Sequence, residues 1–401
     1  MTLNPSLFSG TGLLAPGTNG RKLQSISIGD TTSGNIAIDG LSVGSGLTQN
    51  VSLISGGAVT GTGAMTGVPK LTITAHDASL TNASNEIESL GKVTTTGAFD
   101  LVTKGGVTIS DAIASGSGAV HIVNKTSGDI TLGANGTIAT THNTPVYLTA
   151  ENGFFKNEHA TGTTPISVPG SKYVISTKDS VGNEEGNLNV TVNFRRYGTA
   201  YDTHSIAGYT GNGFVYAEQP TVTVYSERAY GYGNQAFFGT NDKFSFTTEK
   251  LAGDTDATKA LRDSIDAVGL TNLKNRIMAN VSGTTNWGTL TGTTDANAEK
   301  DGSLRPGKGR FGNMAGAAIN VSYNDDATTN PLNYKINLEY RVTPAPLTIK
   351  ANDDVRTYSG TGGAGYTGDS GTNGHGYTVS GLVLGNTLAQ VADIHQIIYG
   401  T

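Results

Sequence analysis

The chain has 401 residues, 56 of them glycine, and only 14% of its residues are charged. Ordinary soluble domains contain about 7% glycine and about 25% charged residues. Glycine follows no three-residue repeat, which excludes a collagen triple helix. The net charge is −6 and no basic block is present, which argues against a nucleic-acid partner.

No apolar run approaches the roughly 18–20 residues of a membrane-spanning helix, so no membrane span is expected. Cysteine is absent, which excludes disulfides, thiolate metal sites and cysteine nucleophiles. A long chain without cysteine favours export through an oxidising compartment. Because no signal peptide is recognisable at the start, we expect an exported protein to continue beyond this sequence.

Short strands separated by glycine-rich turns fill residues 25–155. Apolar residues alternate in pairs, such as Ile36 and Ile38, which indicates strands with one buried face. The stronger pairs lie in segments that start at residues 35, 50, 70, 98, 119 and 145, on average 22 residues apart. A repeat of this length is typical of a solenoid. The pattern predicts a mainly β fold in which residues 1–155 form a right-handed parallel β-helix; a β-sandwich of many short strands is the alternative.

After residue 155 aromatic and charged residues become more frequent. We interpret residues 156–219 as a cap or transition segment that covers the last coil. Two segments then start alike, at Pro220 and Pro346, each with an alternating strand, a charged turn and a tyrosine near glycine. This internal duplication predicts small β-rich modules, a first over 220–345 and a second, truncated one over 346–401.

The first module contains the only convincing helix pattern of the chain. Its start can be capped by Thr255 or Asp256. Leu261, Ile265 and Val268 follow at helical spacing and form one apolar face. With two strands before and two after the helix, the pattern favours a module of β-grasp type, and an Ig-like sandwich with a helical insertion is the alternative.

Two junctions carry a family resemblance. Residues 211–234 (GNGFVYAEQPTVTVYSERAYGYGN) and 340–360 (YRVTPAPLTIKANDDVRTYSG) resemble the junctions of large bacterial surface adhesins. Residues 376–388 (GYTVSGLVLGNTL) are similar to the inner strands of the MBG/YDG-type repeats of those proteins. The glycine-rich coils before them resemble the β-helical shaft of filamentous-haemagglutinin-like exoproteins.

This resemblance implies a secreted structural adhesin that stands on the bacterial cell surface or in a biofilm. It implies that an outer-membrane β-barrel transporter exports the full-length protein by two-partner secretion. It also implies that the binding partner is a host or matrix receptor, either a glycan or a protein.

No arrangement of residues marks a catalytic centre, a cofactor site or a metal site. The GxGxxG matches at 307–312 and 360–365 and the GxSxG match at 40–44 lack the strand and helix context that a nucleotide site or a nucleophile elbow requires. The seven histidines form no HxH or HExxH pair. A polysaccharide-degrading β-helix would need paired carboxylates, whereas the charges within 25–155 are scattered singly.

Aromatic residues crowd the start of the first module. The candidate ligand-binding residues are Tyr225, Tyr230, Tyr232, Phe237 and Phe238, which follow Tyr209, Phe214 and Tyr216. Exposed rings can stack on sugars, so the five candidates could form a glycan platform. The favoured interpretation of the whole cluster is a buried core between the shaft and the first module.

Together these features predict a non-catalytic adhesin fragment, with no cofactor and no metal, whose shaft presents binding modules. Two alternatives remain from the sequence. One is a β-helical enzyme that degrades polysaccharides, and the other is a self-assembling surface or biofilm-matrix scaffold.

Overall fold

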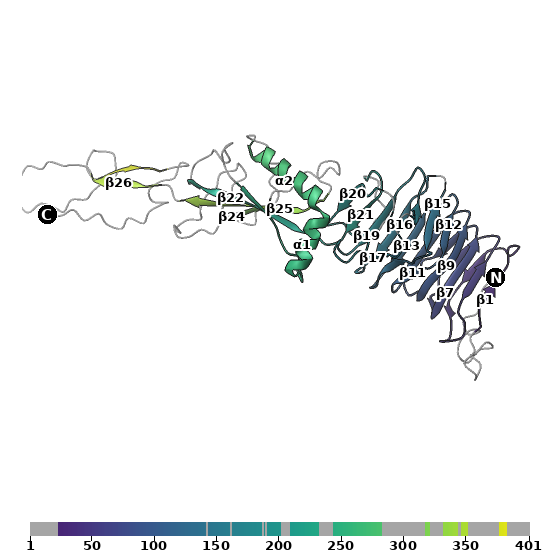
Figure 1. Ribbon diagram of the computed structural model, residues 1–401. Helices are drawn as coiled ribbons and strands as arrows, with labels where there is room; N and C mark the ends of the chain where they lie inside the picture. Colours follow the sequence, from purple (N-terminus) through teal and green to yellow (C-terminus); the bar gives the residue numbers. More distant parts are fainter. Residues whose placement is uncertain are drawn as a thin grey trace, which may run out of the picture. The chain divides into compact units, whose positions relative to one another are not determined.

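The structure is a computed structural model, and it describes residues 23–141, 143–160, 163–186, 188, 191–201, 209–231, 244–282, 317–320, 332–343, 346–351 and 377–382. Within these residues the fold is mainly β, with two helices, and its largest part is a β-helix (Figure 1). Neither described helix has the length and apolar composition of a membrane-spanning segment.

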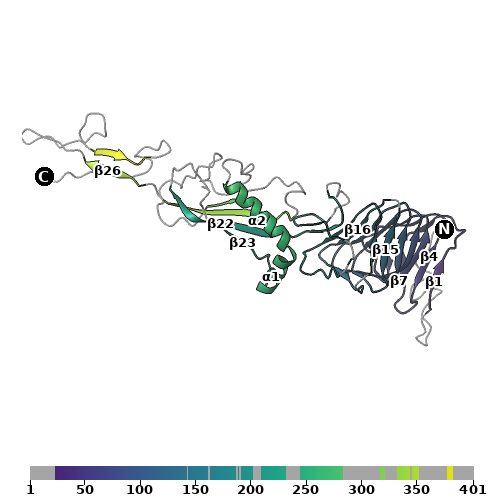
Figure 2. The same cartoon turned by 45° about the horizontal axis from the view of Figure 1, so that its top comes forward.

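Two stacked sheets form the β-helix, and every strand pairing within them is parallel (Figures 1 and 2). The first sheet contains, in order, β1 (Ile26–Ile28), β4 (Val51–Ile54), β7 (Val68–Ala75), β9 (Ile87–Thr95), β11 (Val107–Ile109), β14 (Ile130–Leu132) and β17 (Phe155–Asn157). The far end of β9 pairs a second series, β12 (Ala112–Ser115), β15 (Thr137–Thr140) and β18 (Ile166–Ser167).

The second sheet has nine strands. They are, in order, β2 (Ile36–Ile38), β5 (Val59–Gly61), β8 (Ala78–Leu80), β10 (Phe99–Thr103), β13 (Val120–Asn124), β16 (Val146–Ala150), β19 (Tyr173–Thr177), β21 (Gly213–Tyr216) and β20 (Phe194–Arg196). A short third pair joins β3 (Leu41–Ser42) to β6 (Met65–Thr66). Parallel stacking of successive coils confirms the predicted β-helix and excludes the sandwich alternative, which needs antiparallel strands.

The parallel ladder does not end near residue 155. Strands β19 and β21 continue it through the segment expected to be a cap, with Ile175 opposite Phe214. The last two strands are also exchanged, because β20 precedes β21 in the chain but lies outside it in the sheet. The aromatic and charged residues that suggested a cap are therefore the filling of the final coils.

One column of side chains shows how the coils bury each other. The residues in register along the second sheet are Ile38, Gly61, Leu80, Leu101, Ile122, Leu148, Ile175 and Phe214. The apolar members are at most 1% exposed. At Gly61 an added Cβ would lie 2.8 Å from Leu80 Cδ2, so the leucine fills the space that the glycine leaves.

Buried polar residues line the corners where the chain leaves a strand. Thr95, Ser115 and Thr140 share one register position and are at most 4% exposed. The Thr95 hydroxyl donates to the Gly97 carbonyl at 3.1 Å, and the Thr140 hydroxyl donates to the Thr144 carbonyl at 2.7 Å. These bonds satisfy turn carbonyls that no strand partner reaches, which is why the interior tolerates so many hydroxyl side chains.

Contacts divide the chain into two compact units. The first comprises Met1–Pro220, Lys250–Thr271 and Asp325–Tyr334, and the second comprises Thr221–Glu249, Asn272–Asn324 and Lys335–Thr401. The first unit thus contains, besides the β-helix, helix α1 (Asp256–Ile265) and the start of helix α2 (Ala267–Ser282). These helical residues belong with the shaft although the sequence analysis placed them in the first module.

The second unit contains a four-stranded mixed sheet in the order β23 (Phe244–Thr248), β22 (Thr221–Gly231), β25 (Lys335–Thr343) and β24 (Ala317–Asn320). The central strands β22 and β25 are parallel, and each pairs an antiparallel outer strand. The described strands of this unit form one mixed sheet, and whether the module is of β-grasp or Ig-like type stays a prediction. A separate hairpin-like pair follows, β26 (Thr348–Ala351) with β27 (Tyr377–Ser380).

Truncating one column side chain tests the mutual burial of the coils. Leu101→Ala should lower the free energy of unfolding by about 2–5 kcal/mol, because it removes buried methyl groups and leaves a cavity. The matched control is Thr60→Ala on the exposed face of β5, expected within about 0.5 kcal/mol of wild type. Urea unfolding followed by circular dichroism measures the stability of both variants. Equal losses in the two variants would contradict the mutual burial of neighbouring coils.

Candidate functional site

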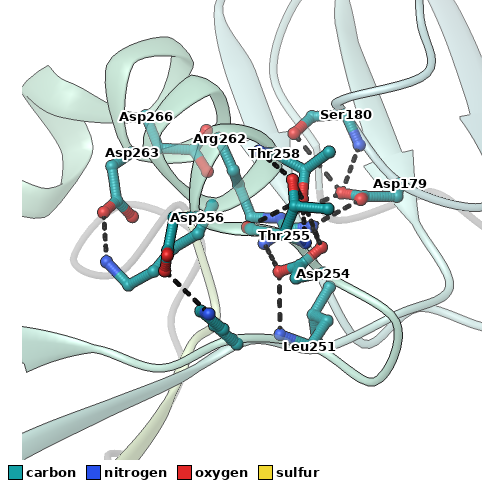
Figure 3. Close-up of polar contacts among 12 residues, drawn as sticks. Asp179, Ser180, Leu251, Asp254, Thr255, Asp256, Thr258, Arg262, Asp263 and Asp266 are labelled. Atoms are coloured by element: carbon teal, nitrogen blue, oxygen red, sulfur yellow. Dashed lines mark hydrogen bonds and ion pairs between the residues drawn. The ribbon is translucent and has the colours of Figure 1, made fainter.

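A cluster of buried charged side chains joins helix α1 to the turn after β19 (Figure 3). Its centre is Arg262 of helix α1, whose residue exposure is 1%. The guanidinium donates to Asp179 through Nε (3.2 Å) and Nη2 (2.7 Å), and to Asp254 through Nη1 (2.5 Å) and Nη2 (3.0 Å). One helix residue therefore holds the turn after β19 and the segment that leads into its own helix.

Local sequence explains why Arg262 points to that turn. Thr255 caps the helix by accepting from Thr258 N at 3.1 Å, and the Thr258 hydroxyl accepts in return from Thr255 N at 2.8 Å. Asp254, just before the cap, also accepts from Leu251 N at 2.8 Å. The fixed helix start places the guanidinium two turns later against both carboxylates.

The apolar face predicted for this helix is not the buried one. Leu261 and Val268 are 48% and 78% exposed, whereas Arg262 and Asp266 are 1% and 2% exposed. Arg262 and Asp266 are four residues apart, so they share the face that meets the β-helix. Ion pairing and hydrogen bonding, rather than hydrophobic burial, select the orientation of the helix here.

The charge balance at Arg262 is maintained by its partners. Burial works against the charged guanidinium, but the hydrogen bonds to Asp254 and Asp179 outweigh it and raise the pKa of Arg262. The hydrogen bond from Arg262 in turn lowers the pKa of Asp254. A buried ion pair of this kind stabilises the fold only while both partners are present. Removal of one partner leaves a buried charge that water cannot solvate.

A second buried carboxyl lies next to this ion pair. Asp266 Oδ2 accepts from the hydroxyl of Tyr197, which follows β20, at 2.8 Å and from the hydroxyl of Tyr334 at 2.7 Å. The Tyr197 hydroxyl also lies 2.6 Å from Ser180 Oγ. We name the set Asp179, Tyr197, Arg262, Asp266 and Tyr334 the closure, because it joins four separate segments at the last coil.

A further, partly buried ion pair lies at the final coils. Arg195 donates to Glu185 at 2.6 Å, and its guanidinium lies 5.8 Å from the centre of the Phe214 ring. The Tyr216 hydroxyl lies 3.4 Å from Glu185, and burial raises the pKa of that phenol well above its usual value. Polar and aromatic side chains thus replace the aliphatic columns in the final coils.

The closure and Asp254 together bring three carboxyl groups to one arginine, residue types that also occur in glycosidase sites. A glycoside hydrolase needs two carboxyls facing a sugar and a water. Here Arg262 donates to Asp179 and Asp254, and two tyrosines donate to Oδ2 of Asp266. Among the described residues, no group of three or more histidine, cysteine or acidic side chains is placed to hold a metal ion.

The candidate ligand-binding residues fall in the second unit. Tyr225 and Tyr230 lie on β22, where they are in register with Glu339 and Val342 of β25. Tyr232, Phe237 and Phe238 lie outside the described residues. Ligand binding by these five residues stays a prediction.

The earlier members of the aromatic cluster belong to the β-helix. Phe214 and Tyr216 are 0% exposed within β21, and Tyr209 stacks on Phe194 with 4.5 Å between ring centres. These three residues are therefore packing residues of the shaft itself. Of the sequence motifs, the GxSxG match includes Ser42 of β3 and is followed by turns, while both GxGxxG matches lie outside the described residues.

Asp179, Arg262 and Asp266 could not be recognised as a cluster from the sequence, because nothing in it links Asp179 to Arg262, which lies 83 residues away. The available signal was the four-residue spacing of Arg262 and Asp266 on a helix that a threonine caps. Comparisons of the chain with protein-family models, with curated proteins and with solved structures found no match.

Removal of the central cation tests whether the closure fastens the fold. Arg262→Met should lower the free energy of unfolding by about 3–5 kcal/mol, because it leaves two buried carboxylates without a partner. Lys259→Met is the matched control, since Lys259 makes a partly exposed i,i+4 pair with Asp263 at 2.6 Å, and a loss of about 0.3–0.5 kcal/mol is expected.

Urea unfolding of the two variants provides the comparison. Adding Asp179→Leu and Asp254→Leu to Arg262→Met should recover much of the lost stability, because no charge then stays buried alone. Losses of the same small size in the Arg262 and Lys259 variants would show that the buried network does not fasten the fold.

Proposed function

We propose that this chain is a non-catalytic segment of a secreted bacterial surface adhesin. In this proposal the β-helix is a shaft, and the β-rich modules that follow it carry receptor contacts. The observation that carries the proposal is the continuous parallel ladder, nine strands in one sheet, filled by side chains along its whole described length.

A shaft must keep its length under load, and the ladder has the features that this requires. Each coil adds about 4.8 Å along the axis, so the eight steps of the second sheet span on the order of 38 Å. The side chains of the interior columns are buried, and the corner hydroxyls are bonded to turn carbonyls. A filled interior of this kind suits transmission of force better than binding of a substrate.

The closure supports the same proposal. A solenoid needs its terminal coil covered, because an open end exposes apolar side chains and unpaired strand edges. In this chain the covering is fastened by buried ion pairs and tyrosine hydrogen bonds. The likeness of the junction sequences to those of filamentous-haemagglutinin-like exoproteins supports a location outside the cell and a host or matrix glycan or protein as receptor.

An adhesion assay tests this function. Beads coated with the full chain should be retained under flow on at least one surface in a panel of glycans and extracellular-matrix proteins. Double replacement of Tyr225 and Tyr230 by alanine tests the predicted platform. Loss of retention with an unchanged urea midpoint would show that the two rings bind the receptor. A lowered midpoint would show instead that the two rings pack in the folded module.

The same protein is then tested for the two alternative functions. Incubation with a panel of polysaccharides should yield no new reducing ends and no unsaturated products. Light scattering should show no growth of particle mass with concentration. Cleavage products together with failure of retention would contradict the adhesin and favour the enzyme, and concentration-dependent assembly without retention would favour the matrix scaffold.

A further inference from the structure

Asp266 occupies an unusual position for a carboxyl group. It is the C-terminal cap of helix α1 and is 2% exposed. Its Oδ2 atom accepts both tyrosine hydroxyls of the closure, while its buried Oδ1 atom has no hydrogen-bond partner among the described residues. A carboxylate bonded on one oxygen only is poorly compensated for its loss of water.

The cations near Asp266 form ion pairs with other acidic residues. Arg262 is held by Asp179 and Asp254, and Arg195 is paired with Glu185 at 2.6 Å. Acidic groups therefore outnumber basic ones around this carboxyl. The titratable groups that face it or influence it are Asp179 from the turn after β19, Arg195 and Tyr197 from β20 and its end, Tyr216 from β21, and Tyr334.

Burial is the largest influence on this group and raises the pKa of Asp266 to about 6. The hydrogen bonds from Tyr334 and Tyr197 and the charge of Arg195 act in the opposite direction and only limit the rise. The folded chain therefore binds a proton that the unfolded chain, with its ordinary carboxyl pKa near 3.8, releases. Between pH 3.8 and about 6 folding takes up a proton, so stability falls as the pH rises through this window.

We propose that Asp266 makes the closure responsive to pH, so that mildly acidic solution holds the end of the β-helix more tightly than neutral solution does. The protonated carboxyl keeps both tyrosine hydrogen bonds through Oδ2 and removes the excess negative charge. The ionised carboxyl favours opening, because opening returns it to water. This property goes beyond the proposed adhesive function, and it would hold for a shaft of any role.

Hydrogen exchange of the full chain tests the proposal at the closure itself. Three amides report on it: Tyr197 N, which donates to Leu332 O at 2.9 Å, Asp266 N, which donates to Arg262 O at 3.0 Å, and Leu270 N, which donates to Asp266 O at 2.9 Å. After correction for the intrinsic rate, the opening constant at these sites should be about tenfold larger at pH 7.5 than at pH 5. Amides of β13 serve as the internal reference and should show no such change.

Two variants distinguish the contribution of Asp266 to the pH dependence from that of other acidic residues. In Asp266→Asn the side chain accepts the same tyrosine bonds without titrating, so the opening constants at the two pH values should agree within about twofold. Asp263→Asn is the matched control on the same helix, with its carboxyl 30% exposed and paired to Lys259, and it should keep the tenfold change.

A wild-type protein with equal protection at both pH values, or an Asp266→Asn variant that keeps the change, would overturn the proposal. If Asp266→Asn fails to fold, carbon-13 NMR of the Asp266 carboxyl in the wild-type chain decides the question. A titration midpoint near 6 supports the proposed pH response of Asp266, and a midpoint at the ordinary value of 3.8 contradicts it.

Discussion

The whole first unit depends on one constraint: no coil can bury its own apolar side chains. A coil contributes only a few inward residues, and their neighbours above and below provide the rest of the contact. Leu101, for example, is buried because Leu80 and Ile122 occupy the same register position in adjacent coils. Stability is therefore shared between neighbours, and an uncovered terminal coil would lose half of its contacts.

That constraint explains why aromatic side chains, ion pairs and buried hydrogen bonds are concentrated at the last coil. The interior changes from aliphatic columns to Tyr173, Phe214 and Tyr216, and charged side chains enter together with hydrogen-bond partners of opposite charge or with tyrosine hydroxyls. Arg262 fastens the helix to the turn after β19, while Asp266 gathers two tyrosines from different segments. Buried ion pairs contribute little net stability but penalise incorrect partners strongly, so they define where the covering segments sit.

Much of the shaft could be predicted from the sequence, because the signals are local and repeated. Pairs such as Ile36 and Ile38 reveal a period of two, and their recurrence gives the coil length. The end of the ladder could not be predicted, since the exchange of β20 and β21 and the long last coil have no counterpart earlier in the chain. The Arg262 site could not be predicted either, because Arg262 and its partner Asp179 are 83 residues apart in the sequence. The apolar stripe of helix α1 was misleading, as tertiary ion pairing determines which face is buried.

Spin-label distances along one outward column test the stacking of coils most directly. The chain has no cysteine, so labels can be placed on Ala37→Cys combined in turn with Ser79→Cys, Asp100→Cys and Tyr147→Cys, which follow it by two, three and five coils. Pulsed EPR should show the distance growing by about 4.8 Å per coil, to on the order of 24 Å for the last pair. Distances that fail to grow in chain order, as in an antiparallel sandwich, would contradict the β-helix.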